Sequence, residues 1–346
     1  MTTYKGINGF AVQSVASDPS PLDEGQVWYN NATYAFKLAA VTTAGTWASG
    51  GTLGTGRYSL GGFGIQTAAV AVGGYNVVPV TNLTNTENYD GSAWTASGVL
   101  STGRRYLSGI GFGTQTAGAI YGGVTNTTLP QTYTNATEEY DGSAWAAGGT
   151  LNTARGNTSN AGTQTAAIAF GGSNKTPGTG SVALTGTESY NGTSWTNIPA
   201  TLNTGRSSLA ASGKGTQTAA LAFGGYDGPP TFLTSTESYN GTTWTNVSSL
   251  NTARYGLSGG GTQTLALAFG GSITPGPGTA ATELWNGTSW TNNPNSMPTT
   301  IQSGAGAGTQ SAGISFGGYS NGGPPFAITH EFTGPGVPQT KTITTS

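Results

Sequence analysis

A tryptophan recurs along this chain every 46 to 51 residues, and several other residues recur in step with it. A fixed period of this length indicates copies of one supersecondary unit that bury their apolar faces against their neighbours. The landmarks give six units, with six copies of each landmark except arginine, which has five. They are Trp47, Trp94, Trp145, Trp195, Trp244 and Trp290; Arg57, Arg104, Arg155, Arg206 and Arg254; Gln66, Gln115, Gln164, Gln217, Gln263 and Gln310; the glycine pairs 73–74, 122–123, 171–172, 224–225, 270–271 and 317–318; and Glu87, Glu138, Glu188, Glu237, Glu283 and Glu331. In the sixth unit Gln302 takes the place of the arginine.

Each unit reads as four short strands. Within residues 254–290, RYGLSGGG is a small-residue strand, GTQT is a tight turn, LALAFGG is an apolar strand, and TELWNGTSW is two strands joined by Asn-Gly. Asn-Gly or Asp-Gly between β segments predicts a type I′ hairpin turn, whose two central residues need positive φ. Five units carry this dipeptide, at Asp90-Gly91, Asp141-Gly142, Asn191-Gly192, Asn240-Gly241 and Asn286-Gly287.

Four strands in a repeat of about 50 residues are typical of a β-propeller blade. The order Arg, then Gly-Gly after an apolar strand, then Glu-x-Tyr, then Trp resembles the kelch family over roughly residues 44–332. The resemblance implies an all-β, six-bladed, kelch-like β-propeller of four-stranded antiparallel blades. It implies little about function, because propellers host many activities.

The two ends of the repeat region complement each other. The last unit, 304–332, offers three strands, and the strand TWASG at 46–50 lacks three strands before it. Pairing them would complete the sixth blade and remove the open sheet edges. We therefore predict an N-terminal arm with a β-hairpin at 1–43, a propeller at 44–332 and a polar C-terminal tail at 333–346.

The composition excludes several classes of protein. Fifty-nine glycines and only 24 charged residues, 11 basic and 13 acidic, leave no window for a long amphipathic helix. Lys and Arg are scattered singly, so we expect no nucleic-acid binding. No apolar stretch approaches the roughly 20 residues that span a bilayer, and the N-terminus lacks signal-peptide features. We therefore expect neither membrane insertion nor signal-directed export.

Catalysis is not expected. An active site needs different residues on different blades, whereas Arg and Glu recur at one place in each unit, so we expect them to pair with each other or to cap strand ends. With no cysteine and one histidine, His330, we expect no metal site and no cofactor, and a structural or solvent-facing role for that histidine. The segment SYNGTSW at 189–195 looks like a sialidase Asp-box but is one residue short and carries Asn for Asp.

The loops that follow the glycine pairs differ from unit to unit and should lie together on one face of the propeller. Loops on a rigid scaffold are where recognition usually occurs. Aromatic side chains with amide and hydroxyl neighbours suit a carbohydrate or a neighbouring protein. The candidate binding residues are Tyr75, Tyr133, Tyr226, Asp227, Phe232, Tyr319 and Phe326.

The segment DPSPLDEGQVWYNNATYAFKL at 18–38 resembles segments of tail and fibre proteins of tailed bacteriophages, particularly those of aquatic bacteria such as cyanobacteria. The resemblance implies a non-catalytic virion structural protein (a tail fibre, appendage or decoration) made in the host cytoplasm and located in the virion. Its N-terminal arm would contact other virion proteins, its variable loops would contact a host-surface glycan, and several copies could assemble within the particle. The alternative is a bacterial lectin-like, carbohydrate-binding propeller.

Overall fold

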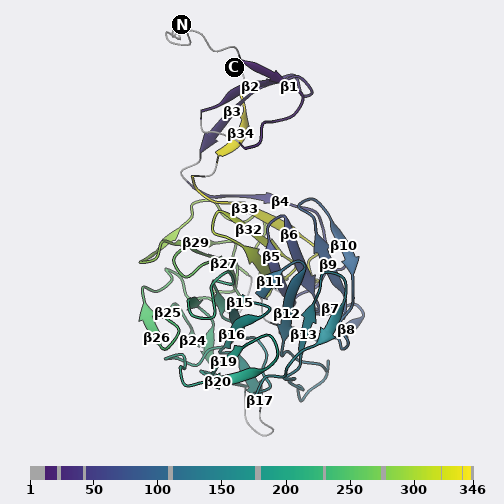
Figure 1. The fold of residues 1–346 in the computed structure, drawn as a ribbon, viewed down its shortest axis with the longest axis vertical. Coiled ribbons are helices and arrows are strands. Elements are labelled where there is room, and N and C mark those ends of the chain that lie inside the picture. The colour runs from purple at the N-terminus through teal and green to yellow at the C-terminus, as the bar shows by residue number, and fades with distance from the viewer. Residues whose placement is uncertain are drawn as a thin grey trace. The chain divides into compact units, whose positions relative to one another are not determined.

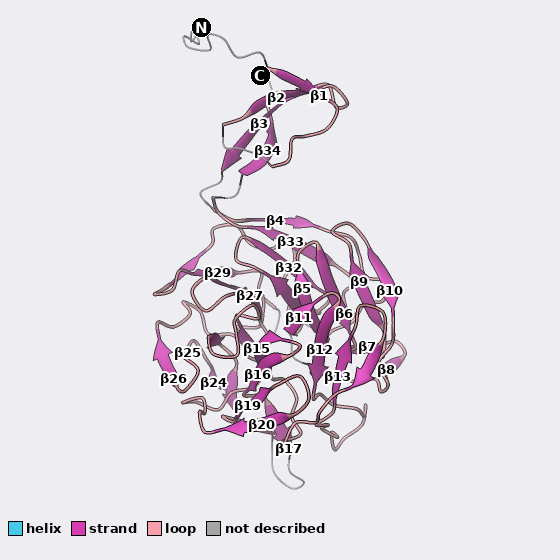
Figure 2. Ribbon diagram, viewed as in Figure 1, coloured by secondary structure: helices cyan, strands magenta, loops and turns pink. Residues whose placement is uncertain are grey.

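The computed structural model describes residues 12–21, 25–41, 44–107, 112–175, 181–228, 231–273, 278–320, 322–336 and 338–343. All regular elements in these ranges are β-strands (Figure 2). They form two compact units, one of Thr46–Thr333 and one that combines Met1–Gly45 with Gly334–Ser346. None of the described residues belongs to a helix long and apolar enough to cross a membrane.

The larger unit contains six four-stranded antiparallel sheets around a central axis (Figure 1). The first strands of neighbouring sheets contact one another in a closed ring, so these strands line the axis. We call the sheets blades 1 to 6. Their strands, from the axis outwards, are β5 (Gly61–Ile65), β6 (Ala68–Val72), β9 (Thr86–Tyr89) and β10 (Trp94–Ser97) in blade 1; β11 (Phe112–Thr114), β12 (Ala117–Tyr121), β13 (Thr137–Tyr140) and β14 (Trp145–Ala147) in blade 2; β15 (Ser159–Thr163), β16 (Ala166–Phe170), β19 (Thr187–Tyr190) and β20 (Trp195–Ile198) in blade 3; β21 (Ala210–Ala211), β22 (Ala220–Phe223), β25 (Thr236–Tyr239) and β26 (Trp244–Val247) in blade 4; β27 (Ser258–Gly261), β28 (Ala266–Phe269), β29 (Thr282–Trp285) and β30 (Trp290–Asn292) in blade 5; and β31 (Ala305–Gly308), β32 (Ala312–Phe316), β33 (Thr329–Thr333) and β4 (Thr46–Ser49) in blade 6.

Three loops between second and third strands carry two-stranded ribbons. They are β7 (Tyr75–Val77) with β8 (Val80–Asn82), β17 (Ser173–Lys175) with β18 (Ser181–Ala183), and β23 (Tyr226–Gly228) with β24 (Thr231–Phe232).

The predicted ring closure is confirmed. Strand β4 pairs antiparallel with β33, with Trp47 opposite Phe332. The Trp47 ring lies 5.0 Å from the Phe332 ring and 5.2 Å from the Phe269 ring of blade 5. Its indole Nε1 also donates a hydrogen bond to Thr282 Oγ1 of blade 5 at 3.0 Å. The N-terminal strand therefore completes blade 6 and packs it against blade 5.

The repeated glutamine and tryptophan tie each blade to the blade before it. Gln115 Nε2 donates to the carbonyl oxygens of Ala69 and Tyr89, at 3.1 and 2.7 Å, and the other five glutamines make equivalent bonds. Trp195 Nε1 donates to Thr137 Oγ1 at 2.9 Å, and the same bond recurs at all six junctions. The repeated landmarks are thus the contacts that hold the ring together.

Small residues on the first and second strands let the blades approach closely. A Cβ added at Gly118 of blade 2 would lie 2.2 Å from the Phe63 ring of blade 1. The phenylalanines that end equivalent second strands are buried, as expected: Phe170, Phe223, Phe269 and Phe316. Aromatic rings from one blade therefore occupy space that glycine and alanine leave free in the next.

The outer hairpin turns are not of the predicted type I′. In blade 1, only Gly91 of the Asp90-Gly91 pair has a positive φ, of 94°. Asp90 Oδ1 accepts the N–H groups of Ser92 and Ala93, both at 2.8 Å, which makes a longer loop with the side chain as its cap. Asp141, Asn191, Asn240 and Asn286 accept the same two bonds. Asp and Asn favour such side-chain-capped turns because their acceptor reaches the backbone two residues ahead.

Two alignments made for the sixth unit are wrong. The carbonyl of each repeated arginine accepts the N–H of the second glycine of the preceding blade, as Arg254 does from Gly225, and in blade 6 Ile301 accepts this bond from Gly271. Ile301, and not Gln302, therefore takes the arginine position. In the third strand, His330 is paired with Ser315 as Glu87 is paired with Ala71. His330, and not Glu331, takes the glutamate position.

The smaller unit is a four-stranded sheet with the order β1 (Gln13–Val15), β2 (Val27–Asn30), β3 (Ala35–Val41) and β34 (Pro338–Thr342). The hairpin of β2 and β3 confirms the predicted N-terminal hairpin. The segment predicted as a polar C-terminal tail at 333–346 contains the strand β34, which pairs antiparallel with β3 along its length. This pairing satisfies the N–H and C=O groups that β3 would otherwise expose at an edge. We call this unit the terminal sheet.

The two faces of the β2–β3 hairpin differ. Trp28 is fully buried and donates its Nε1 hydrogen to Asp18 Oδ1 at 3.0 Å, and Asn30 Nδ2 donates to the same oxygen at 2.8 Å. These bonds hold the pKa of Asp18 below its ordinary value. Because side chains alternate along a strand, Tyr29 and Phe36 lie on the other face, where their rings are 5.1 Å apart and Phe36 is 49% exposed.

Candidate binding site

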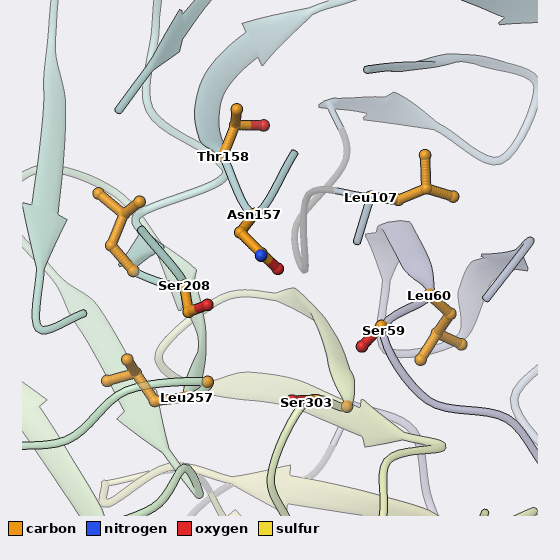
Figure 3. Close-up of a pocket in the computed structure, with 11 residues that line it drawn as sticks. Ser59, Leu60, Leu107, Asn157, Thr158, Ser208, Leu257 and Ser303 are labelled. Carbon is orange, nitrogen blue, oxygen red and sulfur yellow. The ribbon is translucent and has the colours of Figure 1, made fainter. Parts of the chain in front are cut away.

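A ring of strained residues surrounds one end of the propeller axis. The loop from the fourth strand of one blade to the first strand of the next contains one residue with φ between 51° and 59° at every junction: Ser59, Tyr106, Asn157, Ser208, Gly256 and Ser303. We call these residues the axial ring, and Figure 3 shows four of them facing the axis. At five junctions the N–H of a ring residue donates to the carbonyl of the preceding ring residue, at 2.7–2.9 Å. Positive φ costs a non-glycine residue on the order of 1 kcal/mol, so a conformation repeated in all blades is firmly imposed.

The axis narrows directly beneath the axial ring. The next residue is a leucine in four of the six loops, and Figure 3 shows Leu60, Leu107 and Leu257 directed away from the centre, into the buried clusters between blades. The cavity enclosed at this level of the axis is about 40 Å³, which holds water but nothing larger. A ligand at this end of the axis can therefore bind only in the hollow outside the ring.

That hollow is lined with tyrosines. Its lining residues are Tyr58, Tyr106, Tyr133, Tyr226, Tyr255 and Tyr319, with Ser59, Ser173, Ser207, Ser208, Ser303, Asn157 and Gln131. We call it the tyrosine dish; it encloses about 330 Å³. Every blade contributes to it. Among the described residues that line it, none is charged.

The tyrosines hold one another in place. The Tyr58 ring lies 4.6 Å from the Tyr319 ring and 5.4 Å from the Tyr75 ring. On another side of the dish, the Tyr255 ring lies 4.6 Å from Phe232 and 5.9 Å from Tyr226. Because the rings pack in edge and tilted contacts, they present a fixed aromatic surface.

Arg105 fixes one further edge of the dish. Its guanidinium lies 4.7 Å from the centre of the Tyr75 ring and 5.3 Å from the centre of the Tyr106 ring. Its Nη1 donates to Asn82 Oδ1 at 2.9 Å. These cation–π contacts position two tyrosines, and Arg105 itself is not among the residues that line the dish.

The dish is neutral at physiological pH. Burial raises the pKa of Tyr58 to about 12, and the nearby phenols of Tyr106, Tyr75 and Tyr319 add to the shift. Burial also raises the pKa of Tyr319. Both hydroxyls therefore remain protonated and can donate as well as accept hydrogen bonds.

The predicted binding residues divide into three groups. Tyr133, Tyr226 and Tyr319 line the dish, and Tyr75 and Phe232 pack against its tyrosines. Asp227 is exposed on β23 and does not line the dish. Phe326 packs against the buried cluster of Leu267, Phe269, Met297, Ile301 and Phe332, so it supports blade 6 instead of facing a ligand.

Sequence reasoning missed Tyr58, Tyr106 and Tyr255. They follow the repeated arginine by one or two residues, in the loops that enter the first strands. These positions differ between blades, being Tyr58, Arg105, Gly156, Ser207, Tyr255 and Gln302 directly after the arginine position. This variation beside a landmark that recurs in five of the six units is the signal that identifies them.

Of three comparisons with known proteins, the one with solved structures agrees with the propeller fold. No family model matches the chain, and no curated protein matches it either. Among the solved structures that match is the structure of YjhT, a kelch-like β-propeller, with a TM-score of 0.67 and 13% sequence identity over 84% of this chain and 99% of that chain. The larger unit is a six-bladed β-propeller. At this identity the likeness shows the fold alone.

The repeated arginines and glutamates of the propeller form buried ion pairs, as predicted. Arg206 Nη2 lies 2.5 Å from Glu237 Oε1, and the equivalent pairs are Arg57–Glu87, Arg104–Glu138, Arg155–Glu188 and Arg254–Glu283. Arg206 Nη1 also donates to the carbonyl of Ser235 at 2.8 Å, and Glu237 Oε2 accepts the N–H of Asn203 at 2.7 Å. Each pair therefore joins the loop before a blade to the strands of that blade, and its groups are closed to any ligand.

We call each of these ion pairs, with its bonds to the neighbouring backbone, an Arg–Glu clamp. Blade 6 of the propeller lacks it. Ile301 and His330 take the places of arginine and glutamate, and His330 is 3% exposed. Neither nitrogen of the His330 ring has a hydrogen-bond partner in the described part of the chain, and burial lowers the pKa of the ring. The loop position whose N–H binds the glutamate elsewhere is Pro298, which has no N–H. All three partners of the clamp have changed together.

We expect the propeller to lose stability as pH falls below about 6.5. The folded pKa of His330 is depressed, so its contribution is complete above the unfolded pKa of about 6.5 and is lost as pH falls towards the folded value. His330 is the only histidine in the chain, so no other imidazole contributes to the effect. Urea unfolding at pH 7.5, 6.5 and 5.5 should show a falling free energy in the wild type and a smaller fall in His330→Gln. The same decrease in the free energy of unfolding between pH 7.5 and pH 5.5 in both proteins would contradict this expectation.

Proposed function

We propose that this protein is a non-catalytic binding protein whose tyrosine dish binds a neutral carbohydrate. The observation that carries the proposal is the uncharged lining of six tyrosines with serine, asparagine and glutamine. Aromatic rings stack on the apolar faces of sugar rings, while hydroxyl and amide groups pair with sugar hydroxyls. Because Tyr58, Tyr255 and their neighbours are already packed in place, binding would order few side chains.

The distribution of titratable groups supports a binding role without catalysis. Hydrolysis of a glycosidic bond ordinarily needs two carboxyl groups beside the scissile bond. No carboxyl group is among the described residues of the dish, and five of the repeated glutamates are buried in ion pairs. The proposal therefore assigns recognition, and not turnover, to this end of the axis.

We further propose that the protein is a virion structural protein, a tail fibre, appendage or decoration, attached through its terminal sheet. Two observations support this. Residues 18–38 resemble segments of phage tail and fibre proteins. One face of the hairpin in this region carries Tyr29 beside Phe36, which is 49% exposed, and Val27, which is 40% exposed. Contiguous exposed apolar groups mark protein contacts, and many copies in one particle would add avidity to weak glycan binding.

Glycan binding is tested with the full chain on a glycan array, followed by titration with the best neutral ligand. Tyr255→Ala should weaken binding at least tenfold, because it removes a stacking ring and frees Phe232 and Tyr226. Tyr34→Ala is the matched control, since Tyr34 is 82% exposed in the terminal sheet. Wild-type affinity in Tyr255→Ala, or binding of acidic glycans only, would refute the dish as a neutral-sugar site.

Attachment is tested by adding the chain to phage particles stripped of appendages. The wild type should dock, and Phe36→Lys should not, because the charge would be buried at the contact. Glycan binding by Phe36→Lys should be unchanged. If the wild type binds a glycan but does not dock to particles, the virion role is refuted. The alternative function, a lectin-like carbohydrate-binding propeller, is then favoured.

A further inference from the structure

The end of the axis opposite the tyrosine dish is formed by the turns between first and second strands, and the segments that lead to these turns are longer in blades 2 and 4 than in the others. From the axial ring residue to the repeated glutamine, the chain advances seven residues in blades 1, 3, 5 and 6, and nine residues in blades 2 and 4. In blade 4 the longer segment leaves β21 only two residues long. It also places Lys214, a lone basic residue in a stretch of small residues, in this turn.

Lys214 crosses this end of the axis. Its backbone N–H donates to the carbonyl of Gly261 in blade 5 at 2.9 Å. Its Nζ donates to the carbonyl of Gly113 in blade 2 at 3.3 Å. The side chain therefore spans from blade 4 past blade 3 and lies between two hollows, a small one beside Phe63 and a larger one over blades 2 to 4.

The larger hollow suits an acidic ligand of modest size. It encloses about 320 Å³, at the lower end of the range for small-molecule sites of about 300–1,000 Å³. Beside Lys214, its polar lining consists of Thr114, Thr163, Thr165, Thr216 and Gln164. Among its described lining residues, Lys214 carries the only charge.

Among the described residues, no acidic side chain pairs with Lys214, because none of their five ion pairs includes it. An ammonium group has three N–H donors, and the Gly113 carbonyl uses one of them. Burial lowers the pKa of Lys214, which means that this cation is partly desolvated while the described residues supply no counter-charge to it. A bound anion would supply it.

We propose that this hollow binds the carboxylate of an acidic sugar, with Lys214 pairing the carboxylate and the threonine hydroxyls bonding the sugar hydroxyls. One lysine matches the single charge of a uronate. A phosphate group, with a charge near −2, is usually held by arginine forks or by more than one cation, whereas the described lining of this hollow has a single cation. The site is at the opposite end of the axis from the dish and does not depend on it.

The test is calorimetric titration of the full chain with glucuronate, glucose and acetate. Glucuronate should bind at least tenfold more tightly than either of the others, and its affinity should fall with added salt. Lys214→Gln should lower the glucuronate affinity at least tenfold, whereas Lys214→Arg should retain most of it. Lys37→Gln removes the same charge from the terminal sheet and should change nothing. Tyr255→Ala, in the dish, should also leave glucuronate binding intact.

Three results would overturn the proposal. Equal affinity for glucuronate and glucose would show that the carboxylate is not recognised. Equal affinity for glucuronate and acetate would show that the sugar ring is not recognised. Unchanged glucuronate binding by Lys214→Gln would show that Lys214 does not take part in binding. If Lys214→Gln fails to fold, as shown by loss of its cooperative melting transition, Thr163→Val replaces it and should lower glucuronate affinity without affecting acetate; unchanged glucuronate affinity in that variant would overturn the proposal.

Discussion

Replacing Arg206 with alanine is expected to destabilise the propeller by about 3–5 kcal/mol, the usual cost of leaving one member of a buried ion pair alone. Glu237 would keep the N–H of Asn203 but lose its cation, and the carbonyl of Ser235 would lose a donor. Both members of the pair are 0% exposed, so water cannot replace the lost group. The free energy of unfolding from urea titration at pH 7.5 measures the effect.

Blade 6 supplies the control for this experiment. There the arginine and glutamate positions hold Ile301 and His330, and the blade is intact. The double variant Arg206→Ile with Glu237→Gln should therefore be clearly more stable than Arg206→Ala, because it leaves no unpaired buried charge. A double variant no better than the single one would show that the arginine stabilises the blade through packing and not through its charge. An unchanged stability in Arg206→Ala would refute the clamp altogether.

Deleting residues 44–52 is expected to abolish cooperative unfolding. The deletion removes β4, and with it the fourth strand of blade 6 and the Trp47 contacts with Phe269, Phe332 and Thr282. Strand β33 would become an open edge. Blade 6, which already lacks the Arg–Glu clamp, would also lose the tryptophan that bonds it to blade 5. Differential scanning calorimetry of the deletion variant should show no sharp transition, in contrast to the wild type.

The matched control restores the strand at another place in the chain. In a variant of 53–332 with residues 47–52 attached after Phe332 through the turn Asn-Gly-Thr-Ser, Phe332 and Trp47 would be separated by four residues, as Trp285 and Trp290 are, and β4 would pair with β33 as a hairpin. This variant should melt cooperatively. If the deletion variant itself melts like the wild type, the closing strand contributes little and the closure argument fails.

The sequence predicted the blades well because its landmarks are the contacts between blades. Gln115 and Trp195 each bond to the preceding blade, so their spacing carries the geometry of the ring. The sixth unit was misaligned by one residue because Glu331 lies next to His330. A shift of one residue in a strand exchanges its two faces, and Glu331 accordingly accepts a hydrogen bond from Tyr89 of blade 1 at 2.6 Å instead of forming a clamp.

The candidate site was only partly predictable. Tyr133, Tyr226 and Tyr319 lie in loops whose sequence varies between units, whereas Tyr58 and Tyr255 come directly after the repeated arginine and look like part of the conserved frame of the repeat. Their convergence depends on the positive φ of the axial ring, which a single sequence does not reveal at serine or tyrosine. The polar segment of β34 gave no strand signal, because its partner β3 lies about 300 residues away.

The pairing of Thr46 with Thr333 gives the chain the topology of an insertion. The terminal sheet is one small domain whose strands β3 and β34 are interrupted by the whole propeller. Across an open chain of that length, bringing β34 to β3 would carry a large loop-closure entropy. Once β4 and β33 are paired, the two flanking segments start from adjacent residues and meet at a high effective concentration. The small sheet should therefore assemble last, so that only a correctly closed ring displays a finished terminal sheet.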